Sequence, residues 1–212
     1  MTTYDVTTDS SVGVAAAVAA LQTGDLVVLP TDTVYGIAAD AFSPYAVSAL
    51  LAAKGRGRDM PVPVLVGSLR TLDGLVDELG PLARQLVEKF WPGPLTIVVR
   101  SAPSLAWDLG ETRGTVAVRM PLQAVALEVL GQTGPLAVSS ANRSGMPPAV
   151  TAADAEQQLG ESVRVFLDGG PAGEAVPSTI VDLTGNRARV LRAGALTLDA
   201  LREVIPELDE PA

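Results

Sequence analysis

Cysteine and histidine are both absent from this chain of 212 residues, and each absence removes a class of chemistry. Without cysteine there are no disulfides, no thiolate nucleophile and no thiolate metal site. Without histidine there is no Ser-His-Asp triad, no HExxH zinc motif and no imidazole that could move protons. Any active site in this chain must therefore work without an acid–base histidine.

Aromatic residues are also scarce. They make up 4% of the chain although 48% of it is hydrophobic, so the core must consist of Val, Leu, Ile and Ala. Short Val-rich runs alternate with Ala- and Leu-rich helical stretches, which is typical of an α/β fold. We find no internal repeat or linker, and we predict one domain over residues 1–212 with an acidic tail at residues 206–212.

No segment has the length and composition of a membrane span or a signal peptide. The longest apolar run, Val12 to Leu21, is too short to cross a bilayer, and Met1 to Asp5 contains no basic region before an apolar stretch. We therefore expect a cytoplasmic protein without membrane contact. The net charge of −9 argues against broad electrostatic attraction to nucleic acid or to anionic membrane.

Capping and turn residues divide the chain into alternating elements. Ser43 followed by Pro44, for example, is a typical helix start, with an N-cap serine and proline at the first helical position. We predict helices over residues 11–22, 44–53, 72–79, 81–90, 122–130, 151–159 and 198–205, and strands over residues 26–29, 63–66, 95–99, 115–119, 136–139, 163–167, 179–183 and 189–191.

A cationic glycine loop follows the predicted helix 44–53, at Lys54-Gly55-Arg56-Gly57-Arg58. Only two of the 15 basic residues are lysines, so a lysine beside two arginines is suggestive here. Fixed cations on a flexible backbone suit phosphate oxygens, although the loop is neither a Walker A loop nor a Rossmann fingerprint. A cationic helix C-terminus favoured by the helix dipole explains the same residues, and both interpretations stay open.

Polar loops follow several predicted strands. Ser140-Ala141-Asn142 comes after the strand 136–139, and Thr31 to Gly36 carries three hydroxyl groups and one carboxylate. Such side chains can contact ligand oxygens, but taken alone Ser140-Ala141-Asn142 is better explained as an ordinary turn that bonds its own backbone, and only the cationic loop favours a binding role. Asp32 is a candidate for indirect metal contact. Arg119 and Arg192 each end a predicted strand, so each is a candidate clamp for a carboxylate or phosphate, or a member of a structural ion pair.

Taken in order, these segments resemble the YrdC-like family of threonylcarbamoyl-AMP synthases over about residues 24–194. The family signature KxR…SxN stands here as Lys54-Gly55-Arg56 and Ser140-Ala141-Asn142. Four further family segments are present, at Pro30–Gly36, Thr115–Arg119, Pro177–Asp182 and Leu191–Gly194. Since the chain ends near Ala212, it looks like the short form without an extra C-terminal domain.

The resemblance implies a fold, a twisted mixed β-sheet flanked by helices with a concave ligand-binding face. It also implies a reaction, in which L-threonine, bicarbonate and ATP give threonylcarbamoyl-AMP and pyrophosphate. The threonine amine captures the carbon and the carbamate oxygen attacks the α-phosphorus, so no protein nucleophile is required. Mg²⁺ and cationic side chains would neutralise phosphate charge. The implied partner is the tRNA threonylcarbamoyl transferase machinery, and no metal site of the protein's own is expected.

The family pattern also implies residue roles. Lys54, Arg56, Ser140 and Asn142 would form the catalytic centre. ATP would be held by Lys54, Arg56, Thr115, Asn142 and Arg192, and threonine by Thr33, Arg119, Ser140 and Ser178, with Arg119 pairing the threonine carboxylate. Many relatives carry Asn and His where this chain has Met60 and Leu65, and Ser or Thr where it has Ala149 and Val150. Contacts made by those side chains must be absent here or replaced.

Two other functions compete with this prediction. The first is binding of double-stranded RNA without catalysis, on a basic face formed by Arg56, Arg58, Arg113, Arg119 and Arg143. The net charge predicts that such binding is weak and steeply dependent on salt. The second is a paralogue of the same fold with another small substrate, such as the carbamoyl-transfer modules of hydrogenase maturation. Those modules usually sit in longer chains, with zinc-finger-like parts that need the Cys and His missing here.

Overall fold

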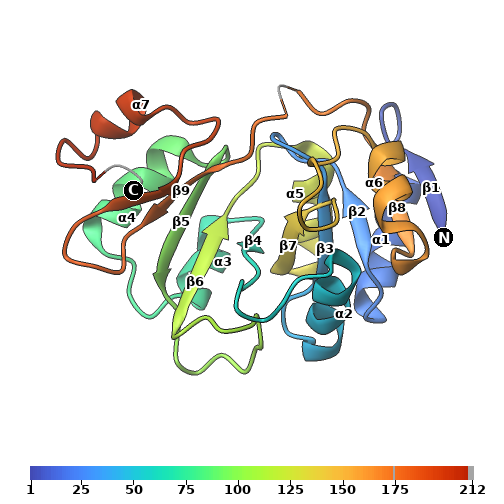
Figure 1. Cartoon of the computed structure of the whole chain (residues 1–212), viewed down its shortest axis with the longest axis horizontal. Coiled ribbons are helices and arrows are strands. Elements are labelled where there is room, and N and C mark those ends of the chain that lie inside the picture. Colours follow the sequence, from blue (N-terminus) through green and yellow to red (C-terminus); the bar gives the residue numbers. More distant parts are fainter. Residues whose placement is uncertain (174, 210–212) are drawn as a thin grey trace.

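A computed structural model describes residues 1–173 and 175–209, and its strands form one mixed sheet in the order β1-β8-β2-β3-β7-β4-β6-β5-β9-β10 (Figure 1). The strands are β1 (Thr2–Asp5), β2 (Val27–Leu29), β3 (Gly36–Asp40), β4 (Val64–Leu65), β5 (Leu95–Arg100), β6 (Thr115–Arg119), β7 (Leu136–Ser140), β8 (Val165–Asp168), β9 (Thr179–Asp182) and β10 (Arg189–Arg192). The helices are α1 (Ser11–Gln22), α2 (Pro44–Lys54), α3 (Leu69–Leu75), α4 (Pro81–Phe90), α5 (Ala124–Thr133), α6 (Ala152–Leu159) and α7 (Leu198–Arg202), with a 3₁₀ turn at Gly160–Ser162. The predicted α/β class, a mixed sheet flanked by helices, is confirmed.

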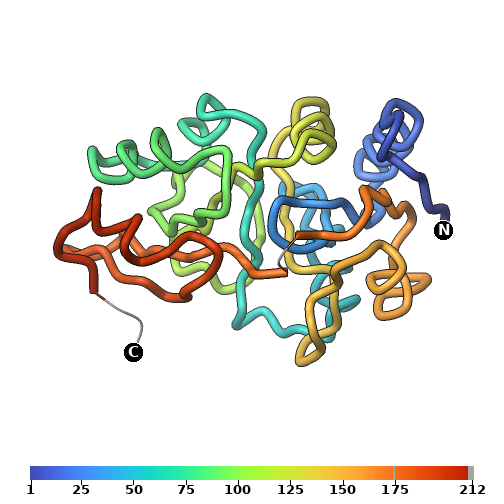
Figure 2. Tube along the Cα trace, turned by 90° about the horizontal axis from the view of Figure 1, so that it is seen from above, coloured from blue at the N-terminus to red at the C-terminus, as the bar shows by residue number. Residues whose placement is uncertain are grey.

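The core divides into two mainly aliphatic clusters, and contrary to the sequence prediction one of them also contains the buried aromatic residues Tyr35, Trp91 and Phe166. The first contains α1 and α5, whose buried residues include Val14, Ala17 and Val129, packed on β2, β3 and β7. The second joins α2, α3, α4 and α6 to the remaining strand faces. Figure 2 shows α1 and α5 on one side of the strands and α2 and α6 on the other. Both faces of the central strands are therefore buried, so the strands read as continuous apolar runs without alternation.

Helix α2 forms as its sequence predicts, and it places the cationic loop. The Ser43 Oγ accepts a hydrogen bond from the Ala46 amide at 3.2 Å, and Pro44 occupies the first turn. At the other end Gly55 adopts φ 62°, a left-handed conformation that favours glycine. The helix therefore ends at Lys54, and the turn at Gly55 directs the chain into the Arg56 loop.

Two strands do not follow from the sequence pattern. β1 is a largely exposed edge strand at Thr2–Asp5, and β3 consists of Gly-Ile-Ala-Ala-Asp, which lacks the β-branched run typical of a strand. β3 is nevertheless buried and pairs antiparallel with both β2 and β7. Its small residues fit between two neighbouring strands, so packing decides its conformation.

The helix predicted at residues 72–79 is wrong in its bounds. The helix α3 begins at Leu69, after the Ser68 Oγ caps the Thr71 amide, and it ends at Leu75 because Val76 leaves the helix to bridge with Ser101. The predicted helix 198–205 likewise ends at Arg202. Part of the predicted acidic tail returns to the sheet, where Asp209 accepts from the Val190 amide at 2.9 Å. Its remainder, residues 210–212, lies outside the described residues.

Between β8 and β9 the chain crosses from one half of the sheet to the other (Figures 1 and 2). This crossing brings Ser178 to the start of β9, next to β5. The backbone around Ser178 also lies against Gly194, where an added Cβ would sit 2.3 Å from the Pro177 oxygen. Only glycine fits at that approach, which explains the glycine of the Leu191–Gly194 segment.

Candidate active site

Lys54 connects the two signature motifs. Its side chain is 3% exposed, and its Nζ donates hydrogen bonds to the backbone oxygens of Ser140 at 2.5 Å and of Asn142 at 2.7 Å. The Ser144 amide in turn donates to the Lys54 oxygen at 2.9 Å. The end of α2 is thereby fixed to the loop that follows β7, so the two motifs, 86 residues apart in sequence, form one unit.

The groups that accept hydrogen bonds from the Lys54 ammonium are uncharged backbone oxygens. Burial, and then the neighbouring Arg56, lower the pKa of Lys54 to about 8. An ammonium group has three N–H donors, and two of them reach carbonyl oxygens. Within the described residues the third has no acceptor, so it is available to a ligand oxygen.

Two buried polar atoms beside Lys54 also lack partners in the described part of the chain, Arg56 Nε and Asn142 Oδ1. Arg56 donates from Nη1 to the Ser139 Oγ at 3.4 Å, while burial lowers its pKa. Asn142, 7% exposed, uses its amide nitrogen to reach the oxygens of Arg143 and Met146. Because buried polar groups are nearly always hydrogen-bonded, these atoms fit a polar ligand or ordered water.

A second cluster surrounds Arg119 at the end of β6. Its Nε donates to the Gly93 oxygen at 3.0 Å, its Nη1 to the Thr33 Oγ1 at 2.8 Å, and its Nη2 to the Asp32 Oδ1 at 2.5 Å. The Arg119 and Asp32 side chains are 8% and 12% exposed, so this ion pair is buried. Burial lowers the pKa of Arg119, and Asp32 opposes that shift. The sequence alone does not single out Asp32 as this ionic partner among the 24 acidic residues.

Ser178 and Arg192 adjoin the Arg119 cluster. Arg192 donates from Nη2 to the Ser178 oxygen at 2.8 Å and to its Oγ at 3.0 Å. The Ser178 hydroxyl also shares a hydrogen bond of 2.8 Å with the buried Thr96. The positive charge of Arg192 further lowers the pKa of Arg119. Thr96, on β5, belongs to this cluster although the sequence does not single it out, because a threonine inside a strand carries no motif signal.

The loop at residues 30–35 connects the two clusters. Thr33 contacts Arg119. Two residues later the backbone carbonyl oxygen of Tyr35 accepts a hydrogen bond from the Ala141 amide at 2.7 Å. Gly36 then pairs with Ser140 as β3 begins. The structure therefore brings together eight of the nine predicted site residues in two neighbouring clusters, which are Lys54, Arg56, Ser140 and Asn142 in one and Thr33, Arg119, Ser178 and Arg192 in the other.

Thr115 makes no hydrogen bond to either cluster in the described part of the chain. It begins β6, four residues before Arg119, which is a distance of about 13 Å along an extended strand. Its hydroxyl donates to the Thr112 oxygen at 2.8 Å, and no hydrogen bond of the described chain connects it to Lys54 or Arg119. A nucleotide role for Thr115 stays a prediction.

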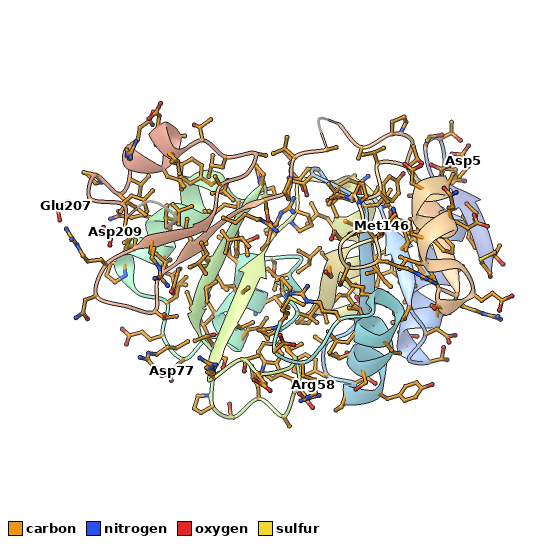
Figure 3. The ribbon with its side chains drawn as sticks, viewed as in Figure 1. Asp5, Arg58, Asp77, Met146, Glu207 and Asp209 are labelled. Carbon is orange, nitrogen blue, oxygen red and sulfur yellow. The ribbon has the colours of Figure 1, made fainter. Side chains whose placement is uncertain are left out.

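The arginines considered for RNA binding do not form one free basic face. Arg119 is buried, and Arg58 forms an exposed ion pair with Asp108 at 2.5 Å. Figure 3 shows Arg58 at the lower edge of the molecule, away from Met146 in the loop after β7. Arg143 donates from Nε to the Gln158 oxygen at 2.8 Å.

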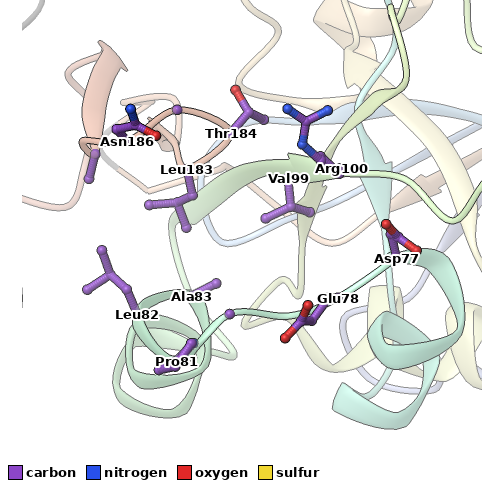
Figure 4. A pocket seen from close by; sticks show the side chains of 13 residues that line it. Asp77, Glu78, Pro81, Leu82, Ala83, Val99, Arg100, Leu183, Thr184 and Asn186 are labelled. Atoms are coloured by element: carbon purple, nitrogen blue, oxygen red, sulfur yellow. The ribbon is translucent and has the colours of Figure 1, made fainter.

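The described structure has two hollows of note, and only one of them adjoins the Lys54 cluster. One of about 420 Å³, between the start of α4 and the β9–β10 turn, is lined by Glu78, Arg100 and Asn186 and contains none of the predicted site residues (Figure 4). The other, of about 670 Å³, lies beside Lys54 and Arg143. The described residues contain no group of three acidic side chains that could hold a metal ion, and none of the described helices is long and apolar enough to span a membrane.

Comparison with known proteins gives a consistent result. The family model Sua5_yciO_yrdC, described as telomere recombination, matches residues 19–194. A Mycobacterium tuberculosis (strain H37Rv) protein, provisionally named a threonylcarbamoyl-AMP synthase, is 58% identical over 193 residues, which cover 91% of this chain and 89% of that protein.

Solved structures of similar proteins have the same fold as this chain. Pyrococcus abyssi Sua5 complexed with L-threonine superimposes with a TM-score of 0.95 at 33% identity, over 99% of this chain and 62% of that one. The chain thus spans about three fifths of the length of that archaeal protein. Escherichia coli YciO has a TM-score of 0.84 at 20% identity, a likeness that shows the fold alone.

Proposed function

The chain belongs to the Sua5/YciO/YrdC family, and from this premise we propose that it is an L-threonylcarbamoyladenylate synthase. It would convert L-threonine, bicarbonate and ATP into threonylcarbamoyl-AMP and pyrophosphate. The observation that carries the proposal is the adjacency of two clusters of different chemistry. One holds cations among neutral groups, and the other holds a neutralised arginine among hydroxyls.

We assign the phosphates of ATP to the Lys54 cluster. The free N–H of Lys54 and the buried Nε of Arg56 are donors without acceptors, which fits phosphate oxygens. Asn142 Oδ1 requires a donor and would accept from the nucleotide. Arg192 would contribute a further cation between the clusters, and Thr115 would contact a more distant part of ATP.

We assign threonine to the Arg119 cluster. Three of the five guanidinium N–H groups bond to the protein, and the other two have no acceptor among the described residues. They would receive the threonine carboxylate. Thr33 and Ser178 supply hydroxyls on either side, and Ser140 lies where the two clusters meet.

This arrangement suits a reaction that needs no protein nucleophile. The threonine ammonium group loses a proton, and its nitrogen then forms a bond to the bicarbonate carbon as water leaves. A carbamate oxygen next attacks the α-phosphorus with departure of pyrophosphate. The protein holds the two reactants adjacent and neutralises the charge that develops on the phosphates.

Mg²⁺ would arrive with ATP, since it is commonly held by substrate phosphates and water with few protein ligands. The lack of an acidic ligand group among the described residues is compatible with that mode. The product would pass to the tRNA threonylcarbamoyl transferase machinery, and a role in tRNA modification would place the protein in the cytoplasm.

The test is pyrophosphate release from ATP, bicarbonate and Mg²⁺ with and without L-threonine, with the adenylate product identified by mass spectrometry. We expect release that depends on both threonine and bicarbonate. Pyrophosphate release that is the same with and without threonine would indicate a paralogue with another substrate. Absence of release, together with retention of double-stranded RNA at low salt, would indicate the RNA-binding alternative.

A further inference from the structure

Asp32 is a partly buried acidic residue in the candidate threonine site, and the proposed function gives it no role. Its Oδ1 accepts from Arg119 Nη2 and from the Leu122 amide, the latter at 2.9 Å. Its carboxylate therefore joins the loop before β3, the end of β6 and the approach to α5. In the described part of the chain the other oxygen, Oδ2, makes no hydrogen bond, although the side chain is only 12% exposed.

Within the Arg119–Asp32 ion pair the two charges are balanced before any ligand binds, while Arg192 beside the pair carries a further positive charge. Arg119 contributes one positive charge and Asp32 one negative charge within a single ion pair. A simple carboxylate bound to Arg119 would place a second negative charge beside Asp32, which repels it. A zwitterion would add no net charge, provided that its ammonium group lies near the carboxylate of Asp32.

We propose that Asp32 determines the specificity of this site for a zwitterionic α-amino acid, with Oδ2 accepting from the amino group while Arg119 binds the carboxylate. The assignment rests on the proposed function, which places the amino acid at Arg119. Asp32 also positions Arg119, because Oδ1 fixes the guanidinium that Thr33 and Gly93 hold on its other sides.

The effect of losing Asp32 on ligand affinity depends on whether Asp32 only orients Arg119 or also contacts the ligand. If Asp32 served only to orient Arg119, its loss would weaken every carboxylate ligand by a similar factor. If Asp32 also contacts the amino group, its loss weakens ligands that have an amino group more than ligands that lack one. Ligands with and without an amino group therefore separate the two roles.

The experiment measures binding of three ligands to the full chain by calorimetry at neutral pH. L-Threonine carries both charges, 3-hydroxybutyrate lacks the amino group, and L-threoninamide lacks the carboxylate. We expect threonine to bind at least about tenfold more tightly than either analogue, the size of one charge-assisted hydrogen bond. In Asp32→Asn, threonine should lose about tenfold in affinity, whereas 3-hydroxybutyrate should bind as well as before or better.

Wild-type protein alone can overturn the inference, so it stays falsifiable even if Asp32→Asn does not fold. Equal affinity for threonine and 3-hydroxybutyrate, in an enzyme that releases pyrophosphate in response to threonine, would refute the role of Asp32 and leave the proposed function intact. If threonine and 3-hydroxybutyrate lose affinity equally in a folded Asp32→Asn variant, Asp32 orients Arg119 without contacting the amino group. Neither threonine binding nor threonine-dependent release would refute the proposed function itself.

Discussion

The two clusters of the candidate site differ in the groups that stabilise a buried positive charge. Lys54 is surrounded by backbone carbonyl oxygens and lies beside a second cation, Arg56. Arg119 is paired with a carboxylate, Asp32, and fixed by a hydroxyl and a carbonyl. The first cluster has two cations, no carboxylate hydrogen-bonded to either among the described residues, and unsatisfied polar atoms, whereas in the second a carboxylate offsets one of the two cations, Arg119 and Arg192.

The difference indicates which ligand each cluster can accept. A cluster with excess positive charge and free donors gains most from a polyanion, because the ligand supplies the missing acceptors. A cluster in which a carboxylate already pairs with the arginine gains less from a polyanion and more from a ligand that carries both a positive and a negative charge. The predictions below test this contrast, beginning with the largest expected effect.

Lys54→Ala should abolish most of the activity. The variant removes a cation next to the phosphates and leaves two carbonyl oxygens without their donor. We expect threonine-dependent pyrophosphate release to fall by about 100-fold or more. Lys54→Met is the matched control, since it keeps the length of the side chain without the charge. Activity of Lys54→Met near that of wild type would contradict the assignment of Lys54 to the phosphates.

Arg119→Lys should affect threonine and spare ATP. Lysine keeps the charge beside Asp32 but lacks the planar fork that can bind Asp32, Thr33 and a carboxylate together. We expect KM for threonine to rise by roughly tenfold while the Kd for ATP stays unchanged. A parallel loss of ATP affinity would show that the two clusters do not act as separate subsites.

The pH dependence of ATP binding should report Lys54. Because its pKa is lowered to about 8, the side chain loses its charge above that pH in the free protein, and ATP should then bind several-fold more weakly. Bound phosphate favours the charged form, so binding near that pH should take up protons. Calorimetry in buffers of different ionisation enthalpy measures this uptake. Lys54→Arg should remove it, and uptake that persists in this variant would assign the effect to another group.

Arg58→Ala should have the smallest effect. The Arg58–Asp108 pair is exposed, with the side chains 53% and 40% accessible, so water screens the interaction. We expect both the melting temperature and threonine-dependent turnover to stay close to wild-type values. A large loss of turnover would extend the phosphate cluster along the whole cationic loop.

The elements that the sequence predicts best are those with local signals. The start of α2 follows from Ser43 and Pro44, and the strands at residues 95–100 and 115–119 follow from Val-rich runs. β3 has no such signal, because Gly-Ile-Ala-Ala-Asp becomes a strand only through its two neighbours. The end of α3 also depends on a distant residue, Ser101, which pairs with Val76.

The candidate site shows the same division. Sequence alone determined which residue types are present, namely cations without histidine or cysteine, and the ordered motifs identified the family. Tertiary structure decided the partners. It paired Arg119 with Asp32, which lies 87 residues away among 24 acidic residues, and directed Lys54 to the oxygens of Ser140 and Asn142. Backbone carbonyls carry no residue identity and ion pairs form across strands, so neither contact is visible until the chain folds.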